Sequence, residues 1–173
     1  MAVANKRGLV RAASKARQSA IAPYSNFKVG AAMLTKRGEI ITGANIESAS
    51  YGLTCCAERV ALFNALTAGK RGFAAIAIVA RAPGGPMPCG ACRQLLAEYA
   101  PDAAVWVADS AALHLIREFS VKELLPAAFV EVPKSDLPPP HPLPHARSEQ
   151  RRERARRGGG ARGGPGGGGA VAQ

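Results

Sequence analysis

Apolar and polar positions in the first part of the chain repeat with the periods of a helix and then of a hairpin. An Ala-rich, weakly amphipathic stretch over 3–21 predicts the helix, and Pro23 ends its pattern. Residues 28–35 and 39–45 each read as a strand, and Lys36-Arg37-Gly38 between them is typical of a tight turn. We therefore expect a two-stranded hairpin directly after the first helix.

The rest of the pattern alternates helices with strands as far as residue 125. Residues 73–80 are continuously apolar, which is typical of a strand buried on both faces, and Ser120 and Glu123 have the spacing of a capping box. The predicted elements are helices at 56–68, 90–99 and 120–125 and strands at 73–80 and 103–108. This alternation predicts an α/β fold with parallel crossovers.

Composition divides the 173 residues into two parts. Residues 1–132 have the apolar content of one domain with its own core. Residues 133–173 are rich in Pro, Arg and Gly and contain almost no large apolar side chains, which predicts a disordered tail. Of the net charge of +11, +5 falls in 134–173. We interpret this tail as an unselected extension, with an arm for RNA or another anionic surface as the alternative.

The chain has no apolar stretch long enough to cross a membrane, and residues 1–17 lack a signal-type apolar segment. A cytoplasmic location is therefore the default expectation, although the acid-free, Ala- and Arg-rich start leaves a transit peptide open. In a reducing compartment, the four cysteines favour metal binding over disulfides.

Two cysteine motifs carry the chemistry of the sequence. The first is Cys56-Ala57-Glu58 and the second is Pro88-Cys89-Gly90-Ala91-Cys92. Three thiolates leave one position of a tetrahedral zinc open for a water molecule, and a carboxylate two residues after the first ligand can shuttle its protons. This arrangement is the signature of zinc deaminases. The competing interpretations are inert buried cysteines and a structural zinc that also uses Cys55, which we interpret as a bystander.

Each motif lies at the predicted start of a helix, where free N–H groups and the helix dipole stabilise thiolates. Three thiolates nevertheless give the metal centre a net negative charge. Arg59 and Arg93 follow the two motifs and are placed to offset it. We expect Arg59 to hydrogen-bond a ligand thiolate.

The chain from 24 to 129 resembles the small homotetrameric cytidine deaminases. The matching strings are Ala22-Pro23-Tyr24-Ser25-Asn26-Phe27, Val29-Gly30-Ala31-Ala32, Asn45-Ile46-Glu47, Ala49-Ser50-Tyr51-Gly52-Leu53-Thr54, Cys56-Ala57-Glu58-Arg59, Pro88-Cys89-Gly90-Ala91-Cys92-Arg93-Gln94 and Glu123-Leu124-Leu125-Pro126-Ala127-Ala128-Phe129. The resemblance implies a three-layer α/β/α fold around a five-stranded mixed sheet. It also implies one Zn²⁺ per subunit and a homotetramer whose active sites borrow residues from neighbouring subunits.

Carried over onto this sequence, the resemblance makes Cys56, Cys89 and Cys92 the zinc ligands and Glu58 the proton shuttle. The expected reaction is the hydrolytic deamination of cytidine and 2′-deoxycytidine to uridine and 2′-deoxyuridine plus ammonia, a step of pyrimidine salvage. The cytidine-to-deoxycytidine preference is not defined by these residues.

The resemblance also assigns the substrate contacts. Asn45 and Glu47 match the residues that hold the ribose 3′-hydroxyl, and an amide with a carboxylate can satisfy both the donor and the acceptor needs of a hydroxyl. Phe27 matches the aromatic residue that packs on the pyrimidine, and Tyr51 and Phe129 resemble residues that complete a neighbour's pocket. We expect a small-molecule nucleoside substrate.

Three alternatives share parts of this pattern. A deaminase of a related aminopyrimidine nucleoside, such as blasticidin S, would use the same zinc site. A polynucleotide deaminase would suit the basic tail, but such enzymes usually resemble the His-ligand version and need an open groove for flanking nucleotides. A non-catalytic RNA-binding protein on a deaminase scaffold would not need the intact Glu58 and three thiols.

Overall fold

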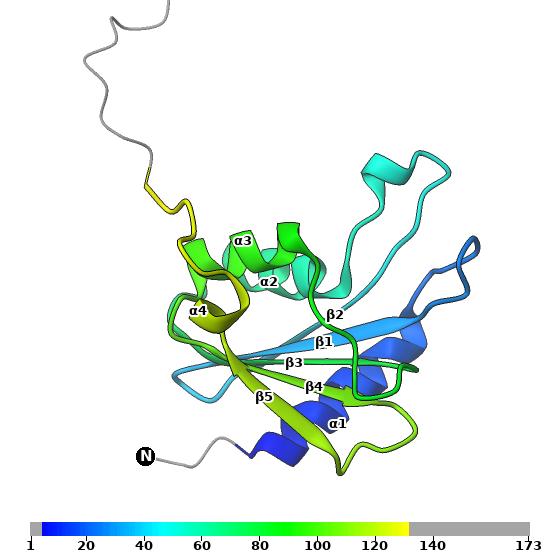
Figure 1. Cartoon of the computed structure of the whole chain (residues 1–173), viewed down its shortest axis with the longest axis horizontal. Helices are drawn as coiled ribbons and strands as arrows, with labels where there is room; N and C mark the ends of the chain where they lie inside the picture. The colour runs from blue at the N-terminus through cyan, green and yellow to red at the C-terminus, as the bar shows by residue number, and fades with distance from the viewer. Residues whose placement is uncertain (1–4, 132–173) are drawn as a thin grey trace, which may run out of the picture. The chain divides into compact units, whose positions relative to one another are not determined.

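A five-stranded sheet with the order β2-β1-β3-β4-β5 forms the centre of the structure (Figure 1). The computed structural model describes residues 5–131. The strands are β1 (Val29–Thr35), β2 (Ile40–Ala44), β3 (Phe73–Ala80), β4 (Ala104–Asp109) and β5 (Ile116–Ser120). The helices are α1 (Lys6–Ala16), α2 (Ala57–Thr67), α3 (Gly90–Tyr99) and α4 (Val121–Leu124), with 3₁₀ turns η1 (Arg17–Ser19) and η2 (Tyr51–Leu53).

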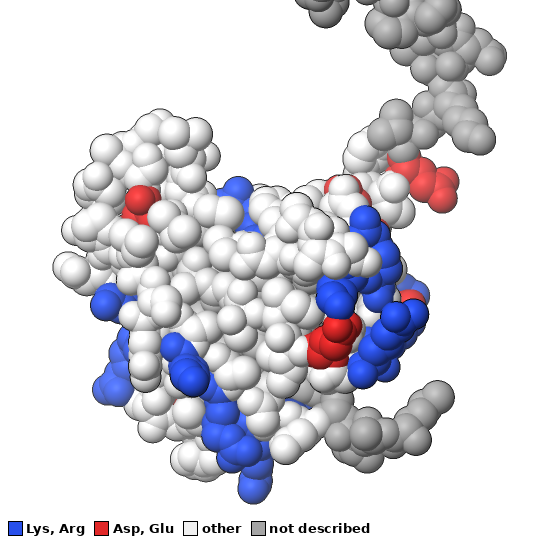
Figure 2. Space-filling view, turned by 180° about the vertical axis from the view of Figure 1, so that it is seen from behind, with Lys and Arg blue, Asp and Glu red and all other residues white. Residues whose placement is uncertain are grey.

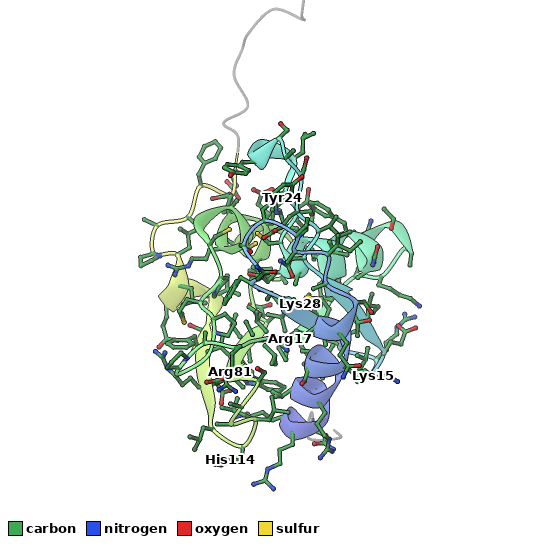
Figure 3. All side chains as sticks on the ribbon, turned by 90° about the vertical axis from the view of Figure 1, so that its right-hand side faces the viewer. Lys15, Arg17, Tyr24, Lys28, Arg81 and His114 are labelled. Atoms are coloured by element: carbon green, nitrogen blue, oxygen red, sulfur yellow. The ribbon has the colours of Figure 1, made fainter. Side chains whose placement is uncertain are left out.

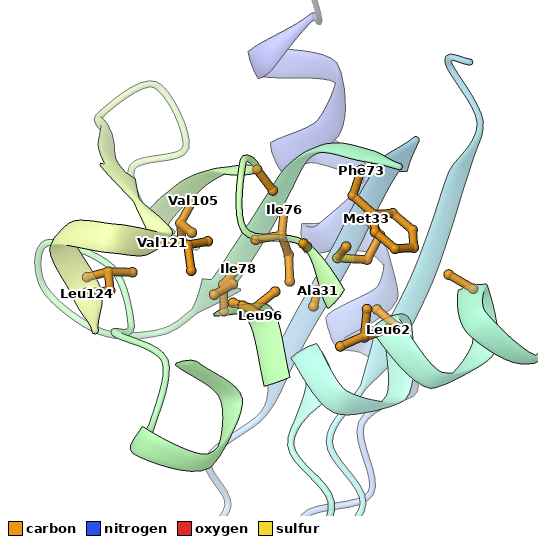
Figure 4. Packing of buried hydrophobic residues seen from close by; sticks show 14 of the residues in the cluster. Ala31, Met33, Leu62, Phe73, Ile76, Ile78, Leu96, Val105, Val121 and Leu124 are labelled. Atoms are coloured by element: carbon orange, nitrogen blue, oxygen red, sulfur yellow. The ribbon is translucent and has the colours of Figure 1, made fainter. Parts of the chain in front are cut away.

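The helices cover both faces of the sheet and so make three layers. Helix α1 packs on one face, whereas α2, α3 and α4 lie on the other, as Figure 1 shows. The larger core fills the space under α2, α3 and α4, where Leu62, Leu96 and Leu124 meet apolar side chains of the sheet such as Ile76 and Val105 (Figure 4). The expected α/β/α arrangement around a mixed sheet is confirmed.

Local signals in the sequence produce the expected ends of several elements. Gly38, with a φ of 90°, forms the turn of the β1–β2 hairpin, and Gly69, with a φ of 72°, follows the end of α2. At α4, the Ser120 hydroxyl accepts the Glu123 N–H while the Glu123 carboxylate accepts the Ser120 N–H. The predicted capping box is therefore confirmed.

Two features of the sheet go beyond the sequence pattern. The expected parallel crossovers are confirmed, because β2, β3 and β4 run in one direction, but the crossover through α2 skips one strand: β1 lies between β2 and β3 and is antiparallel to both. Strand β5 was not visible in the pattern. It is an edge strand with Arg117 and Glu118 exposed at its centre, so it lacks the apolar run of a buried strand.

Two glycines let the helices approach the sheet closely. A Cβ atom on Gly30 in β1 would lie 2.1 Å from the Ala13 carbonyl oxygen of α1. A Cβ on Gly43 in β2 would lie 2.3 Å from the Ala61 nitrogen of α2. Both contacts are with helix backbone, which cannot rotate away as a side chain can. These two residues therefore set the distance between the helices and the hairpin.

Replacing Gly43 by Ala should push α2 off β2 and lower the free energy of unfolding by about 2 kcal/mol, the usual cost of overpacking. Urea unfolding of the zinc-loaded protein measures this loss. Gly52→Ala is the matched control, because a Cβ there meets nothing within 4 Å. Equal stability of the two variants would show that α2 does not rest on Gly43.

Three sequence predictions extend beyond the described residues. The tail 133–173 lies outside them, and so do the boundary of the domain 1–132 and the first residues of the helix predicted over 3–21. Within 5–131, no helix is both long enough and apolar enough to span a membrane.

Candidate metal centre and active site

The starts of α2 and α3 bring the two cysteine motifs together. Cys56 is the N-cap residue of α2, Cys89 is the N-cap residue of α3, and Cys92 lies in the first turn of α3. The backbone of Cys55 exchanges two hydrogen bonds with Ile46, at 2.9 and 3.0 Å, which fixes the start of α2 beside the chain that leaves β2. The expected position of the thiols at two helix starts is confirmed.

The three sulfur atoms have the spacing of a zinc site. The Sγ of Cys89 lies 3.9 Å from that of Cys56 and 3.6 Å from that of Cys92. Zn–S bonds of about 2.3 Å in a tetrahedron place two thiolates about 3.8 Å apart. The donor set and its spacing therefore fit zinc, with a fourth position left for a non-protein ligand. Cys55 is not part of this group.

Contacts within the cluster move the pKa values of Cys56 and Cys92 in opposite directions. A hydrogen bond from Cys92, followed by one from Arg59, lowers the pKa of Cys56 to about 5. The same contact with Cys56, together with burial, raises the pKa of Cys92. Of Cys56 and Cys92, Cys56 is therefore the thiol that ionises first.

The Arg59 guanidinium contacts the cluster from the first turn of α2. Its Nη2 donates to the Thr54 carbonyl at 2.6 Å and to the Cys56 sulfur at 3.7 Å. The structure therefore contains the expected hydrogen bond from Arg59 to a thiol of the cluster, and the role of Cys56 as a metal ligand stays a prediction. Arg93 acts differently, because it donates to the backbone carbonyls of Pro88 at 2.8 Å and Leu124 at 3.1 Å. Arg93 thus ties the start of α3 to α4.

Glu58 is a buried carboxyl group beside the sulfur cluster. Only 6% of its surface is exposed, and its carboxylate contacts the Cys92 thiol. Burial raises the pKa of Glu58 to about 7, and the negative charge of Cys56 adds to the rise. A carboxyl group with this pKa can both accept and donate a proton at neutral pH.

The predicted sugar contacts hold the loop that carries Phe27. The Asn45 side chain accepts the Val29 N–H at 2.8 Å and donates to the Phe27 carbonyl at 2.9 Å. The Glu47 carboxylate accepts the N–H groups of Tyr24 at 2.9 Å and Ser25 at 3.1 Å. Asn45 is buried, and both described hydrogen bonds of its side chain are to backbone groups of this loop.

A cavity of about 330 Å³ opens beside this loop. Its lining residues are Tyr24, Ser25, Glu47, Ser48, Tyr51 and Thr54. In Figure 3, Tyr24 lies toward the end of the molecule that holds the sulfur atoms, and the labelled Lys15, Arg17 and Arg81 lie farther from that end. Of the predicted site residues, Glu47 and Tyr51 line this cavity, whereas the three thiols and Glu58 do not.

Tyr51 and Phe129 are the most exposed of the predicted site residues. Tyr51 lies on η2 and is 80% exposed. It lines the cavity of its own chain together with Glu47. Phe129 is 65% exposed after α4, and its carbonyl oxygen accepts a hydrogen bond from Gln94 of α3 at 2.5 Å. Phe129 does not line the described cavity.

Sequence reasoning missed Ser25, Ser48 and Thr54. They line the cavity, and Ser25 also bonds to Glu47. Small polar residues in a turn are common, and nothing in their own sequence context separates a cavity wall from a solvated loop.

This chain is similar in sequence and in structure to known deaminases. The profile of the cytidine and deoxycytidylate deaminase zinc-binding region matches residues 4–108. A cytidine deaminase of Halalkalibacterium halodurans is 49% identical over 133 residues, which cover 76% of this chain and 99% of that protein. The crystal structure of cytidine deaminase from Burkholderia pseudomallei has 50% identity and a TM-score of 0.67, covering 70% and 97% of the two chains. A blasticidin-S deaminase of Bacillus cereus is 34% identical over 109 residues, 58% of this chain and 76% of that protein.

Proposed function

The chain belongs to the family of the cytidine and deoxycytidylate deaminase zinc-binding region, and from this we propose that it hydrolyses cytidine and 2′-deoxycytidine to the uridines and ammonia. The observation that carries the proposal is the buried Glu58 carboxyl in contact with the three-thiol cluster. We assign Cys56, Cys89 and Cys92 as ligands of one Zn²⁺ per chain and Glu58 as the acid/base residue. Pyrimidine salvage in the cytoplasm is the cellular role we propose.

Zinc held by the three thiolates would supply a Lewis acid that makes a water molecule nucleophilic near neutral pH. Glu58 accepts a proton from the attacking water and delivers it to ring nitrogen N3 as the bond to carbon C4 forms. Glu58 then transfers the second proton of that water to the amino group, which leaves as ammonia. A pKa of about 7 lets one carboxyl group perform both transfers.

The pocket residues support a nucleoside as substrate. We assign Phe27 to the face of the pyrimidine, and Asn45 with Glu47 to the ribose 3′-hydroxyl. The adjoining cavity has Glu47 as the only charged group among its described lining residues. A carboxylate there repels a phosphate group and accepts a hydrogen bond from a hydroxyl, which favours a nucleoside over a nucleotide.

Two alternatives receive less support. Blasticidin S shares the aminopyrimidine, and a related blasticidin-S deaminase is less similar to this chain than the cytidine deaminases are. A polynucleotide would need a continuous basic path. In Figure 2, the Lys and Arg side chains of this face gather in separate groups with uncharged surface between them.

We also propose a homotetramer in which Tyr51 and Phe129 complete the pocket of a neighbouring copy. Both aromatic side chains are mostly exposed in the single chain, and an exposed aromatic residue beside a binding site is typical of an interface. Mass measurement in solution tests this assembly, and a monomeric enzyme with full activity would contradict it.

A substrate panel tests the function. Ammonia release should be measured from cytidine, 2′-deoxycytidine, cytosine, cytidine monophosphate, blasticidin S and single-stranded DNA, with and without a zinc chelator. We expect turnover of the first two nucleosides and its loss in the chelator. Faster turnover of the oligonucleotide or of blasticidin S would assign a different substrate.

Replacing Arg59 by Gln should lower kcat about tenfold at unchanged zinc content, because one charge-assisted hydrogen bond to the Cys56 thiolate is lost. Zinc analysis and steady-state kinetics on the same sample measure both quantities. Arg71→Gln is a matched control, since this arginine bonds only to the Leu66 and Lys70 carbonyls in the described structure. Unchanged kinetics in Arg59→Gln would contradict the role that we assign to Arg59.

A further inference from the structure

Both main-chain polar groups of Phe27 are held by side chains. Its carbonyl accepts a hydrogen bond from the Asn45 amide at 2.9 Å, and its N–H donates to the Ser25 hydroxyl at 2.9 Å. Phe27 is 43% exposed and belongs to neither core cluster, so core packing does not fix its side chain. The place of this ring therefore depends on the bonds to its backbone.

Ser25 joins that backbone to Glu47. The Ser25 hydroxyl donates its single hydrogen to the Glu47 carboxylate while its oxygen accepts the Phe27 N–H. A serine in a plain surface turn makes only the second of these bonds. The bond to Glu47 orients the hydroxyl, so that its lone pairs face the Phe27 amide.

The Glu47 carboxylate keeps room for a ligand. It accepts three hydrogen bonds from the loop, namely from the Tyr24 N–H, the Ser25 N–H and the Ser25 hydroxyl. A carboxylate has about four acceptor positions, which leaves one for a sugar hydroxyl. The Ser25 hydroxyl is also the largest cause that lowers the pKa of Glu47, so the carboxylate is ionised at neutral pH.

The loop conformation makes this bridge possible. Asn26, between the two bonded residues, has a φ of 56°, in the left-handed region that Asn tolerates better than most residues. Beyond the loop, backbone bonds of 2.9 Å fix Ile21 to Asn45 and Glu47. One end of the loop is thus anchored by backbone pairing, and its tip is anchored by Ser25.

We propose that Ser25 is a positioning residue that couples the carboxylate assigned to the sugar, Glu47, to the ring assigned to the pyrimidine, Phe27. The inference rests on the proposed nucleoside function. Through this bridge, the sugar contact and the base contact share one preorganised loop. Loss of the Ser25 hydroxyl releases the Phe27 amide and weakens substrate binding, without touching the zinc ligands or Glu58.

A double-mutant cycle separates this coupling from a structural role. Ser25→Ala should raise KM for cytidine about tenfold with kcat changed less than about threefold, the effect of losing one hydrogen bond to a charged group. In a Phe27→Ala background, the same substitution should change KM less than about twofold, because there is no ring left to position. Equal effects in both backgrounds would overturn the proposal.

Two further variants complete the kinetic test. Ser25→Thr retains the hydroxyl and should restore KM to within about twofold of wild type. Ser19→Ala is the matched control, an exposed serine of η1 whose side chain makes no hydrogen bond within the described part of the chain. A Thr variant as impaired as Ala would also contradict the bridge.

Amide hydrogen exchange of the substrate-free protein tests the bridge without any activity. The Phe27 amide should exchange about tenfold faster in Ser25→Ala and at the wild-type rate in Ser19→Ala. An unchanged rate in Ser25→Ala would overturn the proposal. If the wild-type protein does not deaminate cytidine, the proposed function fails, and the exchange rate still decides whether Ser25 holds the loop.

Discussion

Replacing Glu58 by Gln should lower kcat for cytidine about a thousandfold while the protein keeps one zinc ion per chain. We assign this carboxyl to carry protons from water to the pyrimidine, and its burial sets its pKa near neutrality. An amide of the same shape cannot accept and return a proton. Zinc content should not change, because the three thiols alone form the metal group of the described residues.

The measurement is single-turnover deamination beside metal analysis of the same preparation. Glu39→Gln is a matched control, since this exposed carboxylate of the β1–β2 turn pairs with Lys70 and not with the sulfur cluster. Wild-type kcat in Glu58→Gln at full zinc content would mean that another group moves the protons.

Replacing Cys89 by Ala should remove both zinc and activity, with kcat/KM falling more than about a hundredfold. Cys89 is the exposed thiol of the cluster, so its loss opens no cavity in the core. Its sulfur lies 3.9 Å from that of Cys56 and 3.6 Å from that of Cys92. The remaining pair cannot complete three protein ligands around the metal.

Cys55→Ala is the control for this variant, because Cys55 lies next to the proposed ligand Cys56 but outside the sulfur group. It should keep zinc and activity. Zinc retained at wild-type affinity by Cys89→Ala would show that the metal is held elsewhere. Loss of zinc in Cys55→Ala alone would instead make that residue a ligand.

The three-thiol group could be predicted from the sequence because its residues lie close together within two short motifs. Each motif places its thiols at the start of a helix within a few residues, and Glu58 follows Cys56 by two positions on the same helix. The capping box of α4 and the glycine turn of the hairpin are local in the same sense. Short-range geometry and backbone preferences are sufficient for such features.

Strand pairing and the Phe27 loop could not be predicted in this way. The antiparallel pairing of β1 with β3 joins residues that are 38 (73 − 35) to 51 (80 − 29) positions apart, and no residue of either strand identifies its partner. The Ser25 bond to Glu47 spans 22 residues. The family resemblance assigns Asn45 and Glu47 to the sugar, but only the fold shows that both side chains also hold the loop that carries Phe27.

The separation of the two cysteine-bearing helix starts has a consequence for folding. Cys56 and Cys89 are 33 residues apart in the chain and stand at the starts of two separate helices, α2 and α3. A metal ion bound by both helix starts is a cross-link that closes this loop in the folded state only. Metal supply would then govern how long the enzyme persists in the cell as well as how fast it works, because chain without metal opens more readily to proteases.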